Sequence, residues 1–166
     1  MSESGVPEKM QQVLIVDDTP ENIALVSSIL KGRYRTKVAI SGEKALALAF
    51  SADPPDLILL DIMMPGMDGY EVCRRLKADV TTSDIPVIFL TSKSLEQDEK
   101  TGFDLGAVDY ITKPISPDVV IARVKTHLDL HRQKKMLQEN YKQLVQLEEA
   151  RDSLVHMIVH DLRGPL

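Results

Sequence analysis

The residues best suited to chemistry begin with one carboxylate placed directly after an apolar run. Residues 57–60 are Leu-Ile-Leu-Leu, Asp61 follows them, and a Pro-Gly pair comes at residues 65–66. A short apolar run that ends near turn residues is typical of a buried strand in a parallel sheet. Asp61 is therefore predicted at the carboxyl end of that strand, where it is either part of a ligand site or only a turn former or helix cap.

Four further polar residues stand at the ends of other predicted strands. They are Asp17 and Asp18 after residues 12–16, Thr91 after residues 85–90, and Lys113 after residues 107–112. Taken singly, the acidic pair is explained as a cap, the lysine as a solvated charge and the threonine as a strand former. Right-handed crossovers bring the carboxyl ends of parallel strands to one edge of a sheet, so we expect all five residues to meet there.

Three carboxylates at one edge repel one another and cannot all stay ionised without compensation by a proton or a hard cation. Mg²⁺ prefers oxygen ligands in octahedral geometry. Asp18, Asp61 and a backbone carbonyl just after it, such as that of Met63, are the expected ligands. Asp17 is expected to act through a bound water. The sequence thus predicts a magnesium site.

The same arrangement favours phosphoryl chemistry at Asp61. A carboxylate beside Mg²⁺ and a lysine is well placed to attack phosphorus, and aspartyl phosphate is a known type of covalent intermediate. The cation and Lys113 would neutralise the phosphoryl oxygens during transfer. The Thr91 hydroxyl would bond a phosphoryl oxygen once the group is attached.

The elements that must position these residues alternate along the chain. Predicted strands cover residues 12–16, 35–40, 57–61, 85–90 and 107–112, and predicted helices cover residues 20–31, 43–52, 69–77 and 95–105. Thr19 is the expected N-cap of the first helix, which Gly32 ends. This alternation with short loops predicts an α/β fold, a doubly wound parallel sheet with helices on both faces.

Composition narrows the class of protein. The chain has 43% hydrophobic and 27% charged residues, as is usual for a globular domain, and its net charge of −5 argues against a broad nucleic-acid surface. The single cysteine, Cys73, fits a reducing compartment. Residues 1–10 are expected to be a disordered polar tail without a signal peptide, and no apolar run is long enough for a membrane span. A cytoplasmic location is expected.

Residues 11–126 resemble the receiver domain of bacterial two-component response regulators. The matching residues are Val-Leu-Ile-Val-Asp-Asp at 13–18, Leu-Asp-Ile-Met-Met-Pro-Gly-Met-Asp-Gly at 60–69, Thr91, and Gly-Ala-Val-Asp-Tyr-Ile-Thr-Lys-Pro at 106–114. The spacings from Asp61 to Thr91 and to Lys113 also fit the family. The resemblance implies a CheY-like, flavodoxin-like fold with five parallel strands in the order 2-1-3-4-5.

The resemblance also implies a role for each site residue. Asp61 is the expected acceptor of a phosphoryl group from a phosphohistidine, which a histidine kinase or a phosphotransfer protein supplies. Asp17, Asp18 and the carbonyl of Met63 are expected to surround Mg²⁺ together with this acceptor. Lys113 is expected to contact the phosphoryl group.

A conformational switch is implied as well. The resemblance assigns it to Thr91 and Tyr110, and it implies a cis bond between Lys113 and Pro114. Phosphorylation adds charge and strong hydrogen-bond acceptors at the sheet edge. We expect Thr91 to move toward them and Tyr110 to turn inward into the vacated space, which would change the face formed by the fourth helix, the fifth strand and the fifth helix.

From Pro117 the sequence predicts one long helix to about Leu162, because neither Pro nor Gly occurs again before residue 164. A leucine recurs every seven residues, as in a coiled coil, at Leu130, Leu137 and Leu144. A change of register then continues the stripe through Leu147, Ala150 and Leu154. We expect residues 127–166 to form a signalling helix that pairs in a homodimer. The alternative is a lone amphipathic helix docked on its own domain.

The end of this helix carries a second candidate phosphoacceptor. Residues 160–166, His-Asp-Leu-Arg-Gly-Pro-Leu, resemble the phosphoacceptor box of sensor histidine kinases. The resemblance implies that His160 accepts a phosphoryl group and that Asp161 is its neighbouring acid or base. Gly164 stands where such boxes carry Thr or Asn, which counts against a phosphatase function. Since the chain has no glycine-rich phosphate loop, we expect a piece of a hybrid histidine kinase rather than a self-sufficient kinase.

The leading hypothesis is a phosphorylation switch in which the receiver controls the dimeric helix. A straight helix from Pro117 to His160 is about 65 Å long at 1.5 Å per residue. Asp61 is therefore expected to take its phosphoryl group from another protein, unless the helix bends. One alternative is a Mg²⁺-dependent phosphatase or phosphotransferase with an aspartyl nucleophile, which needs an acid or base two residues later, where Met63 stands. The other is a pseudo-receiver that acts only in oligomerisation.

Overall fold

The computed structural model describes residues 9–92 and 96–163, without the side chains of residues 96–99. Most of the expected N-terminal tail, the predicted helix start at Leu95 and residues 164–166 of the histidine box lie outside the described residues. The chain divides into two compact units, Met1–Asp129 and Leu130–Leu166. We describe each unit by itself.

Among its described residues, the first unit has a parallel sheet of five strands. They are β1 (Gln12–Val16), β2 (Arg35–Ala39), β3 (Leu57–Asp61), β4 (Val87–Thr91) and β5 (Asp109–Thr112). The order across the sheet is β2-β1-β3-β4-β5, and every neighbouring pair is parallel. The predicted fold class, a doubly wound CheY-like α/β sheet with this strand order, is confirmed.

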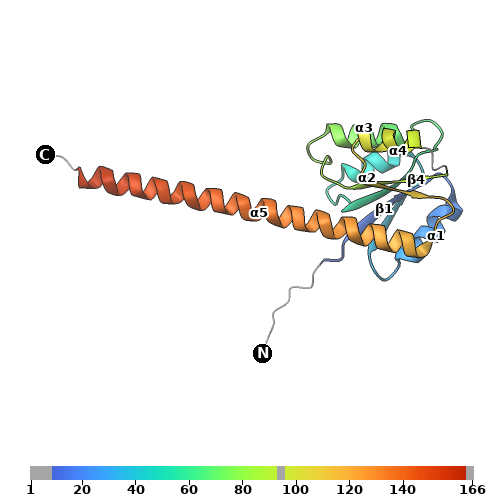
Figure 1. Ribbon diagram of the computed structural model, residues 1–166, viewed down its shortest axis with the longest axis horizontal. Helices are drawn as coiled ribbons and strands as arrows, with labels where there is room; N and C mark the ends of the chain where they lie inside the picture. Colours follow the sequence, from blue (N-terminus) through green and yellow to red (C-terminus); the bar gives the residue numbers. More distant parts are fainter. Residues whose placement is uncertain (1–8, 93–95, 164–166) are drawn as a thin grey trace, which may run out of the picture. The chain divides into compact units, whose positions relative to one another are not determined.

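Helices cover both faces of the sheet (Figure 1). They are α1 (Pro20–Leu30), α2 (Gly42–Ala49), α3 (Gly69–Ala78), α4 (Glu96–Asp104) and α5 (Pro117–Leu162). Successive side chains of a strand point to opposite faces, so β1, which is apolar from Val13 to Val16, contributes to two cores. Leu14 packs in the core that α2 and α3 cover, and Ile15 packs in the core that α1 and the first turns of α5 cover.

Strand β4 starts later and ends later than predicted. It begins at Val87 rather than Ile85, because Pro86 has no N–H to donate and the Ile85 N–H already binds the carbonyl of Thr82 at 3.1 Å. It also includes Thr91, which was predicted to follow the strand. Thr91 is therefore positioned by the hydrogen bonds of the sheet, in register with β5.

Helix α2 ends three residues before its predicted limit, at Ala49 rather than Ala52. The cause is Ser51, whose backbone N–H and hydroxyl both donate to the carbonyl of Leu48, at 3.3 and 2.6 Å. Serine side chains that bond a nearby carbonyl compete with helical hydrogen bonding. The apolar pattern alone does not show this competition.

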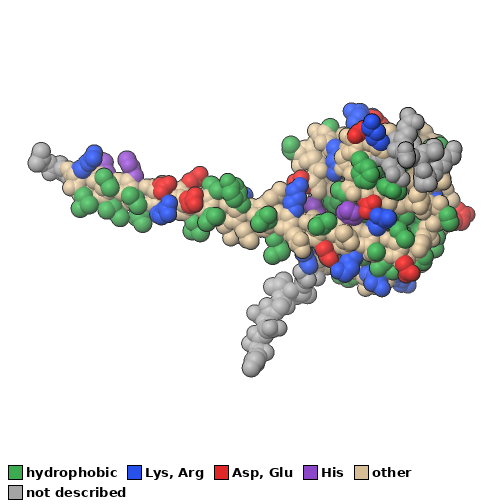
Figure 2. All heavy atoms as spheres, in the orientation of Figure 1, with side chains coloured by type: hydrophobic (Ala, Val, Ile, Leu, Met, Phe, Trp, Pro, Cys, Tyr) green, Lys and Arg blue, Asp and Glu red, His purple; other side chains and the backbone are tan. Residues whose placement is uncertain are grey.

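The second unit consists, over residues 130–162, of the remainder of α5. The large apolar side chains predicted for a coiled-coil seam are exposed in this single chain, namely Leu130, Leu137, Leu144, Leu147 and Leu154. Figure 2 shows hydrophobic side chains gathered along one side of this part of the helix. Pairing through this stripe stays a prediction. Within the described ranges, no helix is both long enough and apolar enough to cross a membrane.

Candidate functional site

Three carboxylates meet at the carboxyl ends of two neighbouring strands. Asp17 and Asp18 directly follow β1, and Asp61 is the last residue of β3. One carboxylate oxygen from each lies within 4.8 Å of the others. Asp17 and Asp61 are buried, whereas Asp18 is exposed. Such a set of hard oxygen donors, open to solvent on one side, fits a cation such as Mg²⁺ that retains part of its water shell.

Lys113 reaches this edge from the end of β5. Its Nζ lies 3.3 Å from Oδ2 of Asp17 and 3.3 Å from Oδ1 of Asp61. Its backbone N–H donates to the carbonyl of Thr91 at 2.7 Å. The peptide bond between Lys113 and Pro114 is cis, as the family resemblance implied. One ammonium group thus bridges the two buried carboxylates.

The electrostatics of the edge leave Asp61 partly uncompensated. Burial raises the pKa of Asp61 most, and the nearby Asp17 carboxylate raises it further. Lys113 and a hydrogen bond from the Met63 N–H lower it, and the outcome is a pKa raised from 3.8 to about 6. The single ammonium group does not fully offset burial and repulsion, so an additional cation would be stabilised here.

The loop after Asp61 is built to turn tightly beside the site. Gly66 has a φ of +75°, a left-handed conformation that side chains disfavour. A Cβ at Gly69 would collide with the backbone of Asp61 and Ile62, so only glycine permits α3 to start so close to the end of β3. Met63, whose carbonyl was predicted to bind the cation, lies in this loop with its side chain largely exposed.

One expected cap is replaced by a hydrogen bond that belongs to the site. Thr19 occupies the N-cap position of α1, but its side chain makes no capping hydrogen bond within the described residues. Instead, its backbone N–H donates to Oδ1 of Asp17 at 2.9 Å. The Asp17 carboxylate is thus held by Thr19 through one oxygen and by Lys113 through the other.

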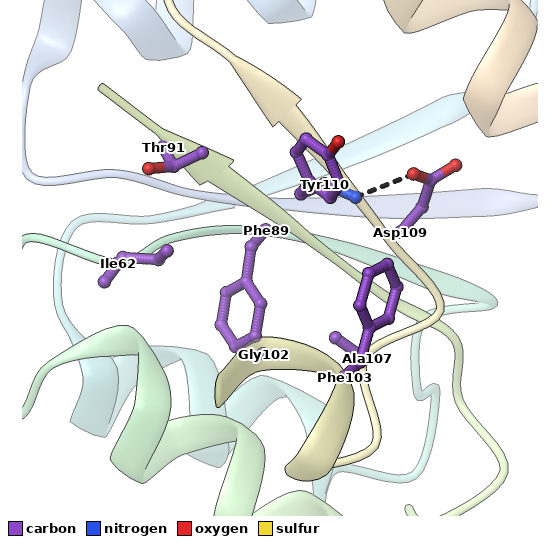
Figure 3. A pocket seen from close by; sticks show the side chains of 8 residues that line it. All are labelled: Ile62, Phe89, Thr91, Gly102, Phe103, Ala107, Asp109 and Tyr110. Atoms are coloured by element: carbon purple, nitrogen blue, oxygen red, sulfur yellow. Dashed lines mark hydrogen bonds between the residues drawn. The ribbon is translucent and has the colours of Figure 1, made fainter. Parts of the chain in front are cut away.

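The two predicted switch residues line the same hollow. Thr91 is buried at the end of β4, and Tyr110 is half-buried on β5. The hollow also touches Ile62, Phe89 and Gly102, and the space in it that can admit water is about 10 Å³, close to the room that one water needs. Figure 3 shows these side chains together. The space between Thr91 and Tyr110 is therefore small in this conformation.

Sequence reasoning did not predict that Asp109, Arg123 and His127 contact one another beside Tyr110. Asp109 accepts hydrogen bonds from both of the other side chains. The partners lie 14 and 18 residues apart in sequence. The spacing of four between Arg123 and His127, which places them on one helix face, is the only local signal of this cluster.

His160 and Asp161 belong to the second unit, on the last turn of α5. Both side chains are strongly exposed, and Nδ1 of His160 lies 3.8 Å from Oδ1 of Asp161. An exposed imidazole beside a carboxylate is accessible to a reaction partner. Gly164, which departs from the kinase box, lies outside the described residues.

Comparison with known proteins places this site in a family. The family described as the response regulator receiver domain matches residues 13–125. A probable cyclic di-GMP phosphodiesterase of Vibrio cholerae is 52% identical over 75% of this chain and 28% of its own length. The response regulator PleD of Caulobacter vibrioides is 45% identical over 69% of this chain and 25% of its own length. The match thus spans about a quarter of the length of each of these two relatives.

A solved structure agrees with these matches. The signal receiver domain of a signal transduction histidine kinase from Syntrophus aciditrophicus is 38% identical, with a TM-score of 0.65, over 72% of this chain and 90% of its own. Receiver domains generally bind Mg²⁺ at an acidic pocket, and Asp17, Asp18 and Asp61 form such a pocket. They take phosphoryl groups from histidine kinases or phosphotransfer proteins. The chain belongs to the response regulator receiver domain family and takes part in two-component phosphorelay signalling.

Proposed function

We propose that this chain is a cytoplasmic phosphorylation switch in which the receiver accepts a phosphoryl group on Asp61 and changes the pairing of the C-terminal helix. The observation that carries the proposal is the lysine bridge, in which Nζ of Lys113 lies 3.3 Å from both Asp17 and Asp61. Buried charges are costly. A purely structural module would therefore not be expected to keep two buried carboxylates and an ammonium group at one edge of the sheet.

The transfer step requires the ionised form of Asp61. One carboxylate oxygen attacks the phosphorus of a phosphohistidine, an O–P bond forms as the P–N bond breaks, and the electron pair leaves with the imidazole nitrogen. Mg²⁺ held by Asp17, Asp18, Asp61 and the Met63 carbonyl would supply positive charge for the phosphoryl oxygens. Lys113 would exchange its contact with Asp61 for a contact with the phosphoryl group.

The switch would follow from the packing around the hollow beside Tyr110. The Thr91 hydroxyl would bond a phosphoryl oxygen, and Tyr110 would fill the space that Thr91 leaves. If so, Thr91→Ala should still be phosphorylated on Asp61 while its helix no longer responds. An unchanged helix response in this variant would remove Thr91 from the mechanism.

The proposed partners are a phosphohistidine donor and a second copy of this chain. The 33 residues of α5 from Leu130 to Leu162 carry an exposed apolar stripe, which supports a homodimer. We divide the chain into a tail over residues 1–10, a receiver over residues 11–126, and a signalling helix over residues 127–166. The box at His160 and Asp161 supports a hybrid histidine kinase as the parent protein. Nucleic acid is not proposed as a partner, because the net charge is −5.

The two rival functions are less well supported. A phosphatase with an aspartyl nucleophile needs an acid or base two residues after it, and the residue there is Met63, whose side chain is 73% exposed and cannot transfer a proton. A pseudo-receiver does not need the acidic triad and the lysine bridge. Both rivals predict no stable phosphoryl group on Asp61.

The proposal is tested by intact mass after incubation with Mg²⁺ and acetyl phosphate. The wild-type chain should gain one phosphoryl group, and Asp61→Asn should gain none. Asp152→Asn is the matched control, because it removes an exposed carboxylate from the second unit and should be phosphorylated like the wild type. Equal phosphorylation of Asp61→Asn and the wild type would overturn the assignment of Asp61.

A further inference from the structure

Asp109 is a carboxylate that the proposed transfer does not use, yet it accepts hydrogen bonds from three different residues. Its Oδ1 accepts from the backbone N–H of Tyr110 at 2.8 Å, which Figure 3 draws as a dashed line. Nη1 of Arg123 lies 3.0 and 2.9 Å from the two carboxylate oxygens, and Nε2 of His127 lies 2.9 Å from Oδ2. We call Asp109, Arg123 and His127 the Asp109 cluster.

Two members of the cluster are largely shielded from water, whereas the Arg123 side chain is 41% exposed. The side chains of Asp109 and His127 are 17% and 15% exposed. A carboxylate only accepts hydrogen bonds, so Nε2 of His127 must carry a proton and donate it. Burial raises the pKa of Asp109, but the hydrogen bonds from His127, Tyr110 and Arg123 outweigh it and hold the pKa below its usual value. Asp109 is therefore ionised at neutral pH and makes charge-assisted bonds, which are stronger than neutral ones.

The cluster joins the switch strand to the start of the long helix. Asp109 and Tyr110 are the first two residues of β5, whereas Arg123 and His127 lie one turn apart on α5. Between and beside them, Val124 and Leu128 are fully buried in the core beneath the sheet. Two successive turns of α5 are thus tied to the strand that carries the switch tyrosine, and the helix continues without a break into the second unit.

The bonding of Arg123 is incomplete. Only Nη1 binds Asp109, and Nε is buried without a hydrogen-bond partner among the described residues. A guanidinium group frequently binds a carboxylate through two nitrogens, and a buried unpaired N–H is unfavourable. If Asp109 shifted, a second arrangement in which Arg123 binds through both Nε and an Nη would satisfy this N–H. This is the property that a coupling element requires.

We propose that the Asp109 cluster transmits the state of Tyr110 to α5, and that Asp109, Arg123 and His127 are positioning residues for the response of the signalling helix. If the backbone of β5 shifts when the Tyr110 side chain turns, the Tyr110 N–H and the Asp109 carboxylate that it binds would move together. The two tethered turns of α5 would follow. The proposal rests on the proposed function, since it needs a phosphorylation-dependent helix. It adds the route by which the signal leaves the receiver.

The test uses the full chain with Leu137→Cys as a reporter for helix pairing. Native Cys73 is buried, so disulfide formation reports on position 137. Cross-linking is measured with Mg²⁺, with and without beryllofluoride as a phosphoryl mimic, and intact mass with acetyl phosphate measures phosphorylation of Asp61 in parallel. In the otherwise native background, the mimic should change the extent of cross-linking.

Two variants and two controls then isolate the cluster. Asp109→Asn and His127→Leu should keep phosphorylation of Asp61 and lose the cross-linking response to the mimic. His127→Gln, whose side-chain N–H₂ can replace Nε2–H, should retain the response. Asp129→Asn breaks the ion pair between Lys125 and Asp129 on the same helix, 2.9 Å long and exposed, and should also retain it. A role in stability alone would lower the melting temperature without removing the response.

The outcomes separate the two proposals. If the native background responds and Asp109→Asn responds equally, the cluster does not transmit the signal, although the proposed function stands. If the native background does not respond while Asp61 is phosphorylated, helix control by the receiver is wrong and the cluster has nothing to transmit. Loss of the response in Asp129→Asn as well would show that any change in this helix disrupts it, and would overturn the specific role of the cluster.

Discussion

The acidic edge of the sheet and the C-terminal part of α5 place their groups in opposite environments. At the edge, Asp17 and Asp61 are charged groups buried among strand ends. On the helix, Leu137, at 71% exposed, and its neighbours along the stripe are apolar groups in water. Each arrangement is unfavourable when left alone, because charges favour water and leucines favour burial. Each region would be stabilised by a group that this single chain lacks. We propose a cation and a phosphoryl group for the acidic edge, and an apolar partner helix for the stripe.

One chain can link the acidic edge of the sheet to the apolar stripe of the helix. Where a region has more than one state, a ligand that binds one state better shifts the populations toward it. The receiver edge changes its charge balance on phosphorylation, and the helix stripe changes its burial on pairing. Coupling requires a physical connection between the two, and in our proposal β5 and the first turns of α5 would provide it.

The largest effect is expected from putting charge on the stripe. Leu137→Glu combined with Leu144→Glu should abolish homodimers, because pairing would bury two unpaired carboxylates in each chain. Light scattering should report a monomer, while phosphorylation of Asp61 continues. Gln146→Glu, which adds one charge about half a turn away from Leu144, is the control and should leave the dimer intact. A dimer that survives the double substitution would place the interface elsewhere.

Removing the lysine bridge should give the next largest effect. In Lys113→Met, phosphorylation of Asp61 by acetyl phosphate with Mg²⁺ should slow by about 100-fold, the usual range for loss of one group that stabilises developing charge. A time course of intact mass measures the rate. Lys125→Met removes an exposed lysine elsewhere and should keep the wild-type rate. If the phosphorylation rate fell by less than about threefold, Lys113 would not stabilise the transfer step.

Asp61→Asn should stabilise the fold at neutral pH in the absence of divalent cations. The native pKa of about 6 lies above 3.8, so the stabilising proton is fully bound below about pH 4 and is lost as the pH rises through 6. The wild type should therefore lose about 1 to 3 kcal/mol between these limits relative to Asp61→Asn. Urea unfolding in EDTA at pH 4.5, 6 and 8 measures the difference. A gap that is the same at all three pH values would contradict the raised pKa.

The smallest effect is expected at a helix cap next to the edge. The Asp68 side chain accepts from the Glu71 N–H at 2.9 Å at the start of α3, and Asp68→Ala should lower the free energy of unfolding by about 1 kcal/mol. Phosphorylation and pairing should not change, because neither region depends on this carboxylate. Asp68→Asn, which retains the capping oxygen, should recover most of the loss. A strong effect on phosphorylation would mean that the cap also holds the site loop.

Much of the site was predictable because strand ends are marked locally. An apolar run followed by a polar residue shows where a buried strand stops, and parallel topology gathers those ends, which is why Asp17, Asp18, Asp61 and Lys113 were found. Helix boundaries that depend on hydrogen bonds were harder to predict. Ser51 ends α2 early by binding the Leu48 carbonyl. At the start of α1, the Asp17 carboxylate accepts from the Thr19 N–H, and the Thr19 side chain does not act as the cap. These depend on which of several nearby donors reaches an acceptor, and the order of residue types does not fix that choice.

By itself, the sequence determined the α/β alternation, the acidic edge and the exposed seven-residue repeat, because each depends on patterns within a few residues. Only the tertiary structure decided that Lys113 bridges two buried carboxylates, and that Asp109 binds both Arg123 and His127. Those contacts join residues between 14 and 96 positions apart. The packing of strands and helices sets such distances, and no local pattern records them.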